Sequence, residues 1–334
     1  MRQQAKVLVT GAGGFIGSHL VGFLKAEGFW VRGVDVKLPD FEASAADEFE
    51  LLDLRRWDNC LKATKGIDHV YALAADMGGM GFISCHHSQI LHNNSLIDLH
   101  SIEAARRNNI SRYLYTSSAC IYPEHRQLDV NSAPLKEPDA YPAAPQDAYG
   151  WEKLVSERLC MHYMQDYGLR TRTVRFHNIF GEKGTWDGGR EKAPAALCRK
   201  IAIAKLTGSP TVEIWGDGEQ TRSFCYIDDC IEGLYRLMES DISEPINLGQ
   251  DRMISINQLA ELIAQIAGIT ITKKYIDGPQ GVRGRNSDNS KMRGLLGWEP
   301  RTSLEEGLAR TYAWVEDQVR AQVQREPRSA SISN

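Results

Sequence analysis

The stretch AKVLVTGAGGFIGSHL, residues 5–20, connects an apolar run directly to a helix-like segment through a turn rich in glycine. Glycine is required there because the backbone turns sharply and lets a pyrophosphate approach the free N–H groups and positive dipole end of the helix. A glycine-rich turn between a strand and a helix predicts a dinucleotide site. The residues expected to contact the cofactor are Gly11, Gly14, Phe15, Ile16 and Gly17.

An acidic residue follows at the distance that such a site requires. Asp35 ends the next β-like run, WVRGVDV, at about the twenty-residue spacing expected for a carboxylate that binds the adenosine ribose. The carboxylate accepts hydrogen bonds from a free 2′-hydroxyl and would repel a 2′-phosphate, so NAD is favoured over NADP. Lys37, two residues later, would soften that preference.

The alternation of β-rich and helical segments sets the fold class. The β-like runs of the first half are AKVLVTG, WVRGVDV, FELLDL, HVYALAA, RYLYTSS and RTVRFHNIF. Helical segments such as LIDLHSIEAARRNN separate them, which predicts βαβ units. We therefore expect an α/β fold with a Rossmann-type doubly wound parallel sheet.

After Phe180 the alternation gives way to Gly-rich loops and isolated helices, which predicts a smaller C-terminal α/β substrate-binding lobe. We expect an NAD-binding domain at 1–180, with a returning segment at about 221–250, and the lobe at 181–220 and 251–320. Residues 321–334 lack apolar periodicity and are predicted to form a disordered tail.

Composition restricts the partners and the compartment. A net charge of −4 argues against a nucleic-acid partner or an anionic membrane surface. No apolar stretch reaches the roughly 18 residues that a membrane span requires, and no h-region of a secretory signal is seen, so a cytoplasmic protein is expected. The seven cysteines form no CxxC pair, and the spacing of His86, His87 and His92 fits no usual zinc arrangement, so neither disulfides nor a metal are predicted.

Candidate catalytic residues lie in two further segments. In QDAYGWEKLVSERL, Tyr149 and Lys153 are four residues apart and share one helix face, where the ammonium would stabilise a phenolate that acts as a base. In SSACIYP, Ser118 and Cys120 follow the strand-like run RYLYT and should lie at its carboxyl end.

Together these features resemble the extended short-chain dehydrogenase/reductase superfamily over nearly the whole chain. The resemblance implies that Ser118 hydrogen-bonds the sugar hydroxyl being oxidised, that Tyr149 removes its proton, and that Lys153 holds both Tyr149 and the nicotinamide ribose. It places Asp53 beside the adenine. It also implies a homodimer formed through helices at about 89–107 and 149–167.

Longer motifs narrow the resemblance. DMGGMGF, RFHNIFG, GTWDGGREKAPAA, WGDGEQTRSF and GVRGRNSDN, with Cys120 where most sugar-nucleotide members carry threonine or serine, resemble the GDP-mannose 3,5-epimerase family. In that family NAD oxidises C4 of the mannose ring, and two groups exchange protons at C3 and C5 before C4 is reduced again. The resemblance implies that Cys120 and Lys192 are this pair; which of them abstracts and which donates is left open.

The same resemblance implies a set of substrate-binding positions for GDP-mannose and its epimers, in which the cations match the diphosphate or guanosine end. They are Gly78, Ser118, Ala119, Cys120, Asn178, Glu191, Lys192, Ala193, Lys200, Gln220, Arg222 and Arg283.

Two alternatives stay open at this stage. One is a related sugar-nucleotide 4-epimerase or 4,6-dehydratase, against which Cys120 and Lys192 argue because neither reaction needs that pair. The other is a non-catalytic NAD-binding regulatory protein, for which loss of the serine, tyrosine and lysine set would be the sign; Ser118, Tyr149 and Lys153 are all present.

Overall fold

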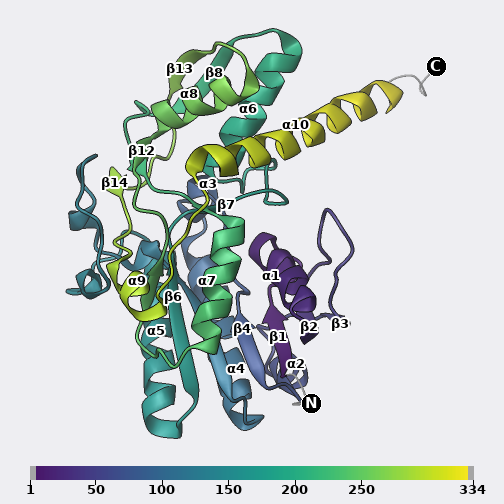
Figure 1. Cartoon of the computed structure of the whole chain (residues 1–334), viewed down its shortest axis with the longest axis vertical. Helices are drawn as coiled ribbons and strands as arrows, with labels where there is room; N and C mark the ends of the chain where they lie inside the picture. Colours follow the sequence, from purple (N-terminus) through teal and green to yellow (C-terminus); the bar gives the residue numbers. More distant parts are fainter. Residues whose placement is uncertain (1–4, 330–334) are drawn as a thin grey trace.

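The structure, a computed structural model, describes residues 5–329 and is built on a sheet of seven parallel strands (Figure 1). In spatial order the strands are β11 (Ile246–Leu248), β6 (Arg170–Phe176), β5 (Arg112–Ser118), β4 (His69–Ala72), β1 (Lys6–Thr10), β2 (Trp30–Asp35) and β3 (Glu48–Leu51). The strand order changes direction between β1 and β4, which is where open α/β sheets bind their ligands. The predicted doubly wound parallel sheet is confirmed.

Helices bury both faces of this sheet, which explains why its strands read as nearly continuous apolar runs. In β1, Val7 and Val9 point to one face and Leu8 to the other. The first face is covered by α1 (Phe15–Ala26) and α7 (Ile227–Glu239). The second is covered by α2 (Trp57–Thr64), α4 (His87–Arg107) and α5 (Ala148–Tyr167).

A second layer of structure lies over the carboxyl ends of the strands (Figure 1). It comprises α6 (Ala193–Thr207), α8 (Ile256–Ala267), α10 (Leu304–Ser329) and the parallel pair β8 (Thr211–Trp215) and β13 (Thr272–Ile276). A capping box between Ser255 and Gln258 begins α8. Helix α10 packs against both α6 and α8.

Short elements connect the two layers. They are α3 (Met80–Ile83), α9 (Ser290–Leu296), β7 (Ile179–Phe180), β9 (Thr221–Arg222), β10 (Cys225–Tyr226), β12 (Ile254–Ser255), β14 (Gly284–Arg285) and the 3-10 turns η1 (Ala119–Ile121), η2 (Glu124–Arg126) and η3 (Glu137–Ala140). Strand β9 pairs with both β12 and β14, so segments far apart in the sequence meet above the sheet.

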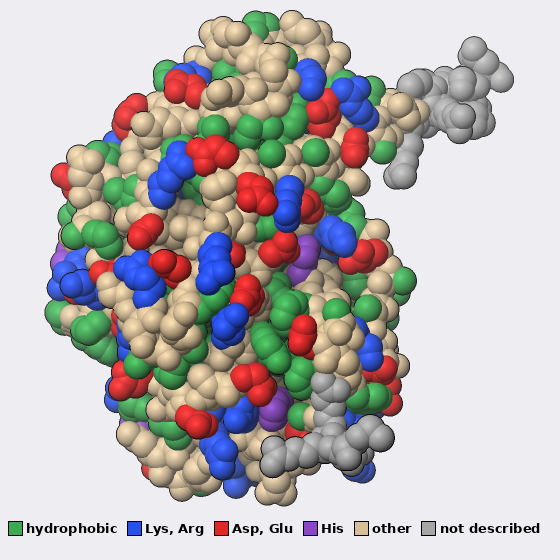
Figure 2. Space-filling model, in the orientation of Figure 1, with side chains coloured by type: hydrophobic (Ala, Val, Ile, Leu, Met, Phe, Trp, Pro, Cys, Tyr) green, Lys and Arg blue, Asp and Glu red, His purple; other side chains and the backbone are tan. Residues whose placement is uncertain are grey.

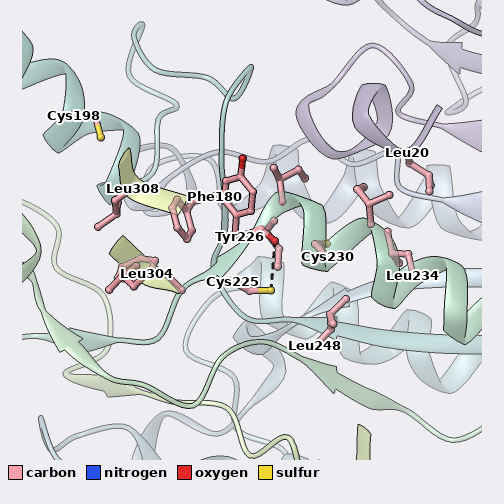
Figure 3. Packing of buried hydrophobic residues seen from close by; sticks show 14 of the residues in the cluster. Leu20, Phe180, Cys198, Cys225, Tyr226, Cys230, Leu234, Leu248, Leu304 and Leu308 are labelled. Atoms are coloured by element: carbon pink, nitrogen blue, oxygen red, sulfur yellow. Dashed lines mark hydrogen bonds between the residues drawn. The ribbon is translucent and has the colours of Figure 1, made fainter. Parts of the chain in front are cut away.

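One apolar cluster runs from the sheet into the lobe. Figure 3 shows Leu20 of α1 and Leu234 of α7 in the same packed layer as Leu308 of α10 and Cys198 of α6. Because this core is continuous, the lobe is held on the sheet by burial of apolar surface rather than by a flexible linker.

Helix α7 and strand β11, which lie within 221–250, pack on the sheet, and α9 packs against β11 as well. Helix α10 continues into the predicted disordered tail and ends at Ser329. Residues 330–334 lie outside the described part of the chain.

The surface in Figure 2 carries basic and acidic side chains interspersed on the visible face. No helix within residues 5–329 is long and apolar enough to cross a membrane.

A buried ion pair lies beneath the carboxyl end of the sheet. The Arg175 guanidinium of β6 donates to both carboxylate oxygens of Glu157 on α5, at 2.8 and 2.9 Å, and both side chains are almost fully buried. Ser117 Oγ of β5 donates to the same carboxylate at 2.5 Å. Burial lowers the pKa of Arg175, but the neighbouring carboxylate outweighs it and the net shift is upward.

We expect Glu157→Gln to lower the free energy of unfolding by about 3–5 kcal/mol, because it leaves the Arg175 charge buried without its counter-ion. Urea unfolding followed by circular dichroism measures this. The control is Glu306→Gln, which removes the exposed partner of Arg310 on α10 and should change stability by less than about 0.5 kcal/mol. Equal losses in the two variants would contradict the prediction.

Candidate active site

A cavity of about 930 Å³ opens at the carboxyl ends of β1, β4 and β5 and extends under the lobe. The glycine-rich turn forms one end of its wall, and residues of α6 and β8 form the other. The position coincides with the change in strand order, so the fold itself creates the site.

The glycine-rich turn can receive a pyrophosphate. Gly14 precedes α1 and offers no side chain to cap it, so N–H groups of the first helical turn face the cavity without an internal partner. A Cβ at Gly17 would lie 2.1 Å from the carbonyl oxygen of Gly11, so only glycine lets the helix pack on the turn. The cavity wall includes Gly11, Gly14, Phe15, Ile16 and Gly17, as the sequence predicted.

The carboxylates expected near the adenosine are both in this wall. Asp35 accepts hydrogen bonds from the backbone N–H groups of Gly13 and Val36, at 2.9 and 2.6 Å, which fixes it beside the turn. Lys37 pairs with Asp40, so its charge is already compensated. Asp53 forms a two-pronged ion pair with Arg55, which lowers the pKa of its carboxyl group. These donors and acceptors fit a dinucleotide with free ribose hydroxyls.

The start of α5 is pressed against the turn that follows β5. Asp147 caps the helix by accepting from the Gly150 N–H at 2.8 Å, and a Cβ at Gly150 would lie 2.2 Å from the Cys120 carbonyl oxygen. Tyr149 therefore packs against Cys120. Burial raises the pKa of the Tyr149 phenol; the Lys153 ammonium and a hydrogen bond with Ser118 act in the opposite direction without outweighing it, so the net shift is upward.

Lys153 is buried in a group of polar side chains behind Tyr149. Its Nζ lies 3.9 Å from Asp98 Oδ2 and 4.8 Å from the centre of the Tyr115 ring. Tyr115 donates to Asp98 at 2.8 Å. Burial lowers the pKa of Lys153, but the acidic side chains of Glu152 and Asp98 act in the opposite direction and the net shift is upward.

Glu152 itself faces inward on α5 and is 1% exposed. Burial raises its pKa to about 8, with the neighbouring Asp98 carboxylate acting in the same direction. Asp98 and Glu152 were not predicted from the sequence, since they belong to no motif and lie on two different helices.

Cys120 and Lys192 both line the cavity. Within residues 5–329 no carboxylate pairs with Lys192, and burial lowers the pKa of its ammonium group. The Cys120 sulfur accepts a hydrogen bond at 3.3 Å from Arg285, whose Nε donates to Gln127 at 2.5 Å. The fixed cation beside the sulfur is therefore an arginine, and Lys192 is left free to lose its proton.

Other predicted substrate positions are also in the cavity wall. They are Gly78, Ser118, Ala119, Asn178, Glu191, Ala193, Lys200, Gln220 and Arg222. Arg222 is half-buried, donates to the Val282 carbonyl at 2.6 Å, and burial lowers its pKa to about 9. Gln220 Oε1 is buried and, within the described residues, has no hydrogen-bond partner.

Arg283 is the exception among the predicted positions. It lies outside the cavity wall and pairs with Asp217 through two 3.0 Å hydrogen bonds near the surface. Parallel pairing of β14 with β9 directs Arg285, two residues later, toward the cavity instead. No three His, Cys, Asp or Glu side chains within residues 5–329 are grouped to hold a metal ion.

Many known proteins are similar to this chain in sequence or in structure. Residues 7–249 match the profile of the NAD dependent epimerase/dehydratase family. The chain belongs to that family. It is 53% identical to the GDP-mannose 3,5-epimerase of Arabidopsis thaliana, over 95% of this chain and 84% of that protein. It is 52% identical to GDP-mannose 3,5-epimerase 1 of Oryza sativa subsp. japonica, over 95% and 83%. The predicted family is confirmed.

Solved structures give the same grouping. The UDP-N-acetylglucosamine 4-epimerase of Methanobrevibacter ruminantium superposes with a TM-score of 0.83 at 27% identity, over 95% of the epimerase and 99% of that chain. The UDP-glucuronic acid 4-epimerase of Bacillus cereus, solved with UDP-glucuronic acid and NAD, gives 0.79 at 28% identity, over 94% and 99%. NAD is thus the cofactor of the family, as predicted.

We expect Glu152→Gln to be more stable than the wild type, with a gain that grows between pH 5 and pH 8. In this range the unfolded chain has lost the Glu152 proton while the folded chain, with a pKa of about 8, still holds it, so wild-type stability falls as pH rises. The gain should increase by up to about 1.4 kcal/mol per pH unit. Urea unfolding at several pH values measures it; a difference that does not vary with pH would contradict the prediction.

Proposed function

We propose that the epimerase inverts C3 and C5 of GDP-D-mannose to give GDP-L-galactose, and gives GDP-L-gulose when only C5 inverts. The observation that carries this proposal is the position of Cys120 and Lys192 in one cavity with Ser118, Tyr149 and Lys153. A 4-epimerase or 4,6-dehydratase needs no such pair. The high identity to the plant enzymes favours the same substrate.

The first task of the chain is to prepare C4 for oxidation. Ser118 and Tyr149 bind the C4 hydroxyl, and Tyr149 takes its proton, because the buried ammonium of Lys153 favours the phenolate. NAD, when bound, supplies the acceptor that takes the C4 hydrogen and later gives it back. The glycine-rich turn and Asp35 would hold the cofactor at the other end of the cavity.

The second task is proton exchange beside the C4 ketone. The hydrogens on C3 and C5 are α to that ketone and are acidic enough for a side chain to remove. Inversion needs one group on each face of the carbon, and Cys120 and Lys192 come from different elements of the cavity wall. Burial lowers the pKa of Lys192, which makes its ammonium easier to deprotonate, while the Arg285 guanidinium donates a hydrogen bond to the Cys120 sulfur.

The remaining cavity residues would bind the nucleotide. Lys200 and Arg222 provide positive charge for the diphosphate, and Arg285 takes the position in the cavity that the sequence resemblance gave to Arg283. The unpaired Oε1 of Gln220 is an acceptor for an N–H group, such as those on the base-pairing edge of guanine.

Incubation with GDP-mannose in D₂O, followed by NMR of the sugars, tests the proposal. The wild type should incorporate deuterium at C5 and C3 of L-configured products. Lys192→Arg should reduce this incorporation at least ~100-fold, because a guanidinium does not give up its proton. The control Lys62→Arg, on the exposed surface of α2, should leave it unchanged. A 4-keto-6-deoxy sugar, or a C4 epimer without deuterium, would instead support the alternative reactions.

We also infer a cytoplasmic homodimer. The exposed side chains of Leu91 and Leu99 on α4, and of Trp151 and Val155 on α5, repeat at four- and eight-residue spacings, and the two helices pack side by side. Two copies could bury these stripes in a four-helix interface.

All seven cysteines are free thiols, which supports a reducing compartment such as the cytoplasm.

The double variant Leu99→Glu/Val155→Glu should convert the dimer to a monomer, because it introduces like charges into the apolar interface. Light scattering coupled to size-exclusion chromatography gives the mass. Leu295→Glu, which replaces an exposed leucine on α9, is the matched control and should remain dimeric. A wild type that elutes as a monomer at micromolar concentration would remove this inference.

A further inference from the structure

The loop that carries Lys192 is fixed by contacts of the residues next to Lys192, and not by contacts of the lysine side chain. Lys192 is the residue that precedes α6, and its side chain forms no ion pair with any residue from 5 to 329. Whatever fixes the position of its amine must act through the loop at 188–192. The two residues before Lys192 make those contacts.

Arg190 joins this loop to the segment that follows β4. Its Nη1 donates to Asp76 Oδ1 at 3.1 Å and to the Met77 carbonyl at 3.4 Å. Its guanidinium carbon lies 3.8 Å from the centre of the Phe82 ring, close enough for a cation–π interaction. The Arg190 carbonyl accepts from the Gly79 N–H at 3.0 Å.

The Lys192 loop and the segment after β4 lie so close together that only glycine fits at position 79. A Cβ at Gly79 would lie 2.3 Å from the Glu191 carbonyl oxygen. Asp76 is itself held by Gln89 and Asn93 of α4, which donate to its other oxygen at 2.9 and 3.0 Å. The Arg190 contacts therefore connect the loop to the rigid helix α4, and not merely to another loop.

Glu191 makes the corresponding connection to the lobe. It accepts from Arg199 on α6 at 2.8 Å and from the Gly189 N–H at 2.7 Å. Before these contacts, Gly188 and Gly189 have φ values of +91° and +85°, and nothing lies within 4 Å of a Cβ built on either. The chain can turn freely at this point, so the Arg190 contacts decide where the loop rests.

We propose that Arg190 is a positioning residue for proton exchange: its ion pair with Asp76 and its contact with Phe82 join the Lys192 loop to the dinucleotide domain and hold the Lys192 amine at the sugar. This inference rests on the proposed function. Under the proposed function, oxidation at C4 depends on Ser118, Tyr149 and Lys153, which belong to β5 and α5 rather than to this loop. Loss of Arg190 should therefore slow proton exchange and spare C4 oxidation.

The test compares Arg190→Gln, Arg190→Lys and a control in the full-length protein. Arg236→Gln is the control because Arg236 also pairs with a carboxylate, Glu232, and lies 5.8 Å from the Trp298 ring centre, with a similar side-chain exposure of 45% against 47%. Its helix, α7, contributes nothing to the cavity wall.

For Arg190→Gln we expect kcat for deuterium incorporation at C5 and C3 to fall about 10–100-fold, as a misplaced catalytic group predicts. KM for GDP-mannose should stay within about twofold of the wild-type value. In a single turnover, C4 oxidation is reported by the rise in absorbance at 340 nm, and its rate should stay within about threefold of the wild-type rate. Arg190→Lys, which keeps the charge opposite Asp76, should recover part of the exchange rate. Arg236→Gln should match the wild type in all of these.

Three results would overturn the proposal: an unchanged exchange rate, a raised KM with unchanged kcat, or an equal loss of C4 oxidation and exchange. The second would make Arg190 a substrate ligand and the third would indicate general damage.

Amide hydrogen exchange of peptides covering 76–83 and 188–193 gives a readout independent of the reaction. Arg190→Gln should speed exchange in both peptides, and unchanged protection would also overturn the proposal. Failure of the wild type to incorporate deuterium would contradict the proposed function, while these peptides would still decide the role of Arg190.

Discussion

The contact between the first turn of α5 and the turn after β5 is the constraint on which the site depends. Because Gly150 carries no side chain, the helix rests directly on the Cys120 carbonyl, and one short contact places Tyr149 beside both Ser118 and Cys120. The residues proposed for C4 oxidation and one of the two proposed for proton exchange are therefore fixed by the same piece of backbone. A Cβ at position 150 would lie 2.2 Å from the Cys120 carbonyl oxygen, so the helix and the turn would have to move apart.

Buried ion pairs between α5 and its neighbours keep this contact in place. Glu157, two turns along α5 from Gly150, holds Arg175 of β6, and Lys153 between them lies 3.9 Å from the Asp98 carboxylate of α4. Each of these ions is costly to bury alone, and each is acceptable only because its partner comes from a neighbouring element. The network thus disfavours any shift of α5 relative to the sheet, and it keeps an ammonium at the back of the site.

Sequence reasoning reached residues of the cavity wall whose placement is local. The glycine-rich turn, Asp35 and the Tyr149–Lys153 pair are defined by spacings within one strand–turn–helix unit or one helix, so their grouping can be expected without the fold. It did not reach Arg285 or Asp98, whose positions depend on the pairing of β14 with β9 and on the packing of α4 against α5. It also predicted a disordered tail from residue 321 where α10 continues to Ser329, because a mostly polar, exposed helical turn such as 322–324 carries no apolar periodicity.

The two residues proposed for proton exchange come from separable parts of the chain. Ser118, Cys120, Tyr149 and Lys153 all belong to the sheet and the elements packed on it, whereas Lys192 enters with α6, whose other faces are covered by α8 and α10. An oxidoreductase scaffold could therefore acquire or lose one half of its carbon-acid chemistry by exchanging the segment before α6, without any change to the residues that bind the cofactor. In this architecture the lobe supplies one partner of the acid–base pair, and the sheet supplies the other partner together with the redox residues.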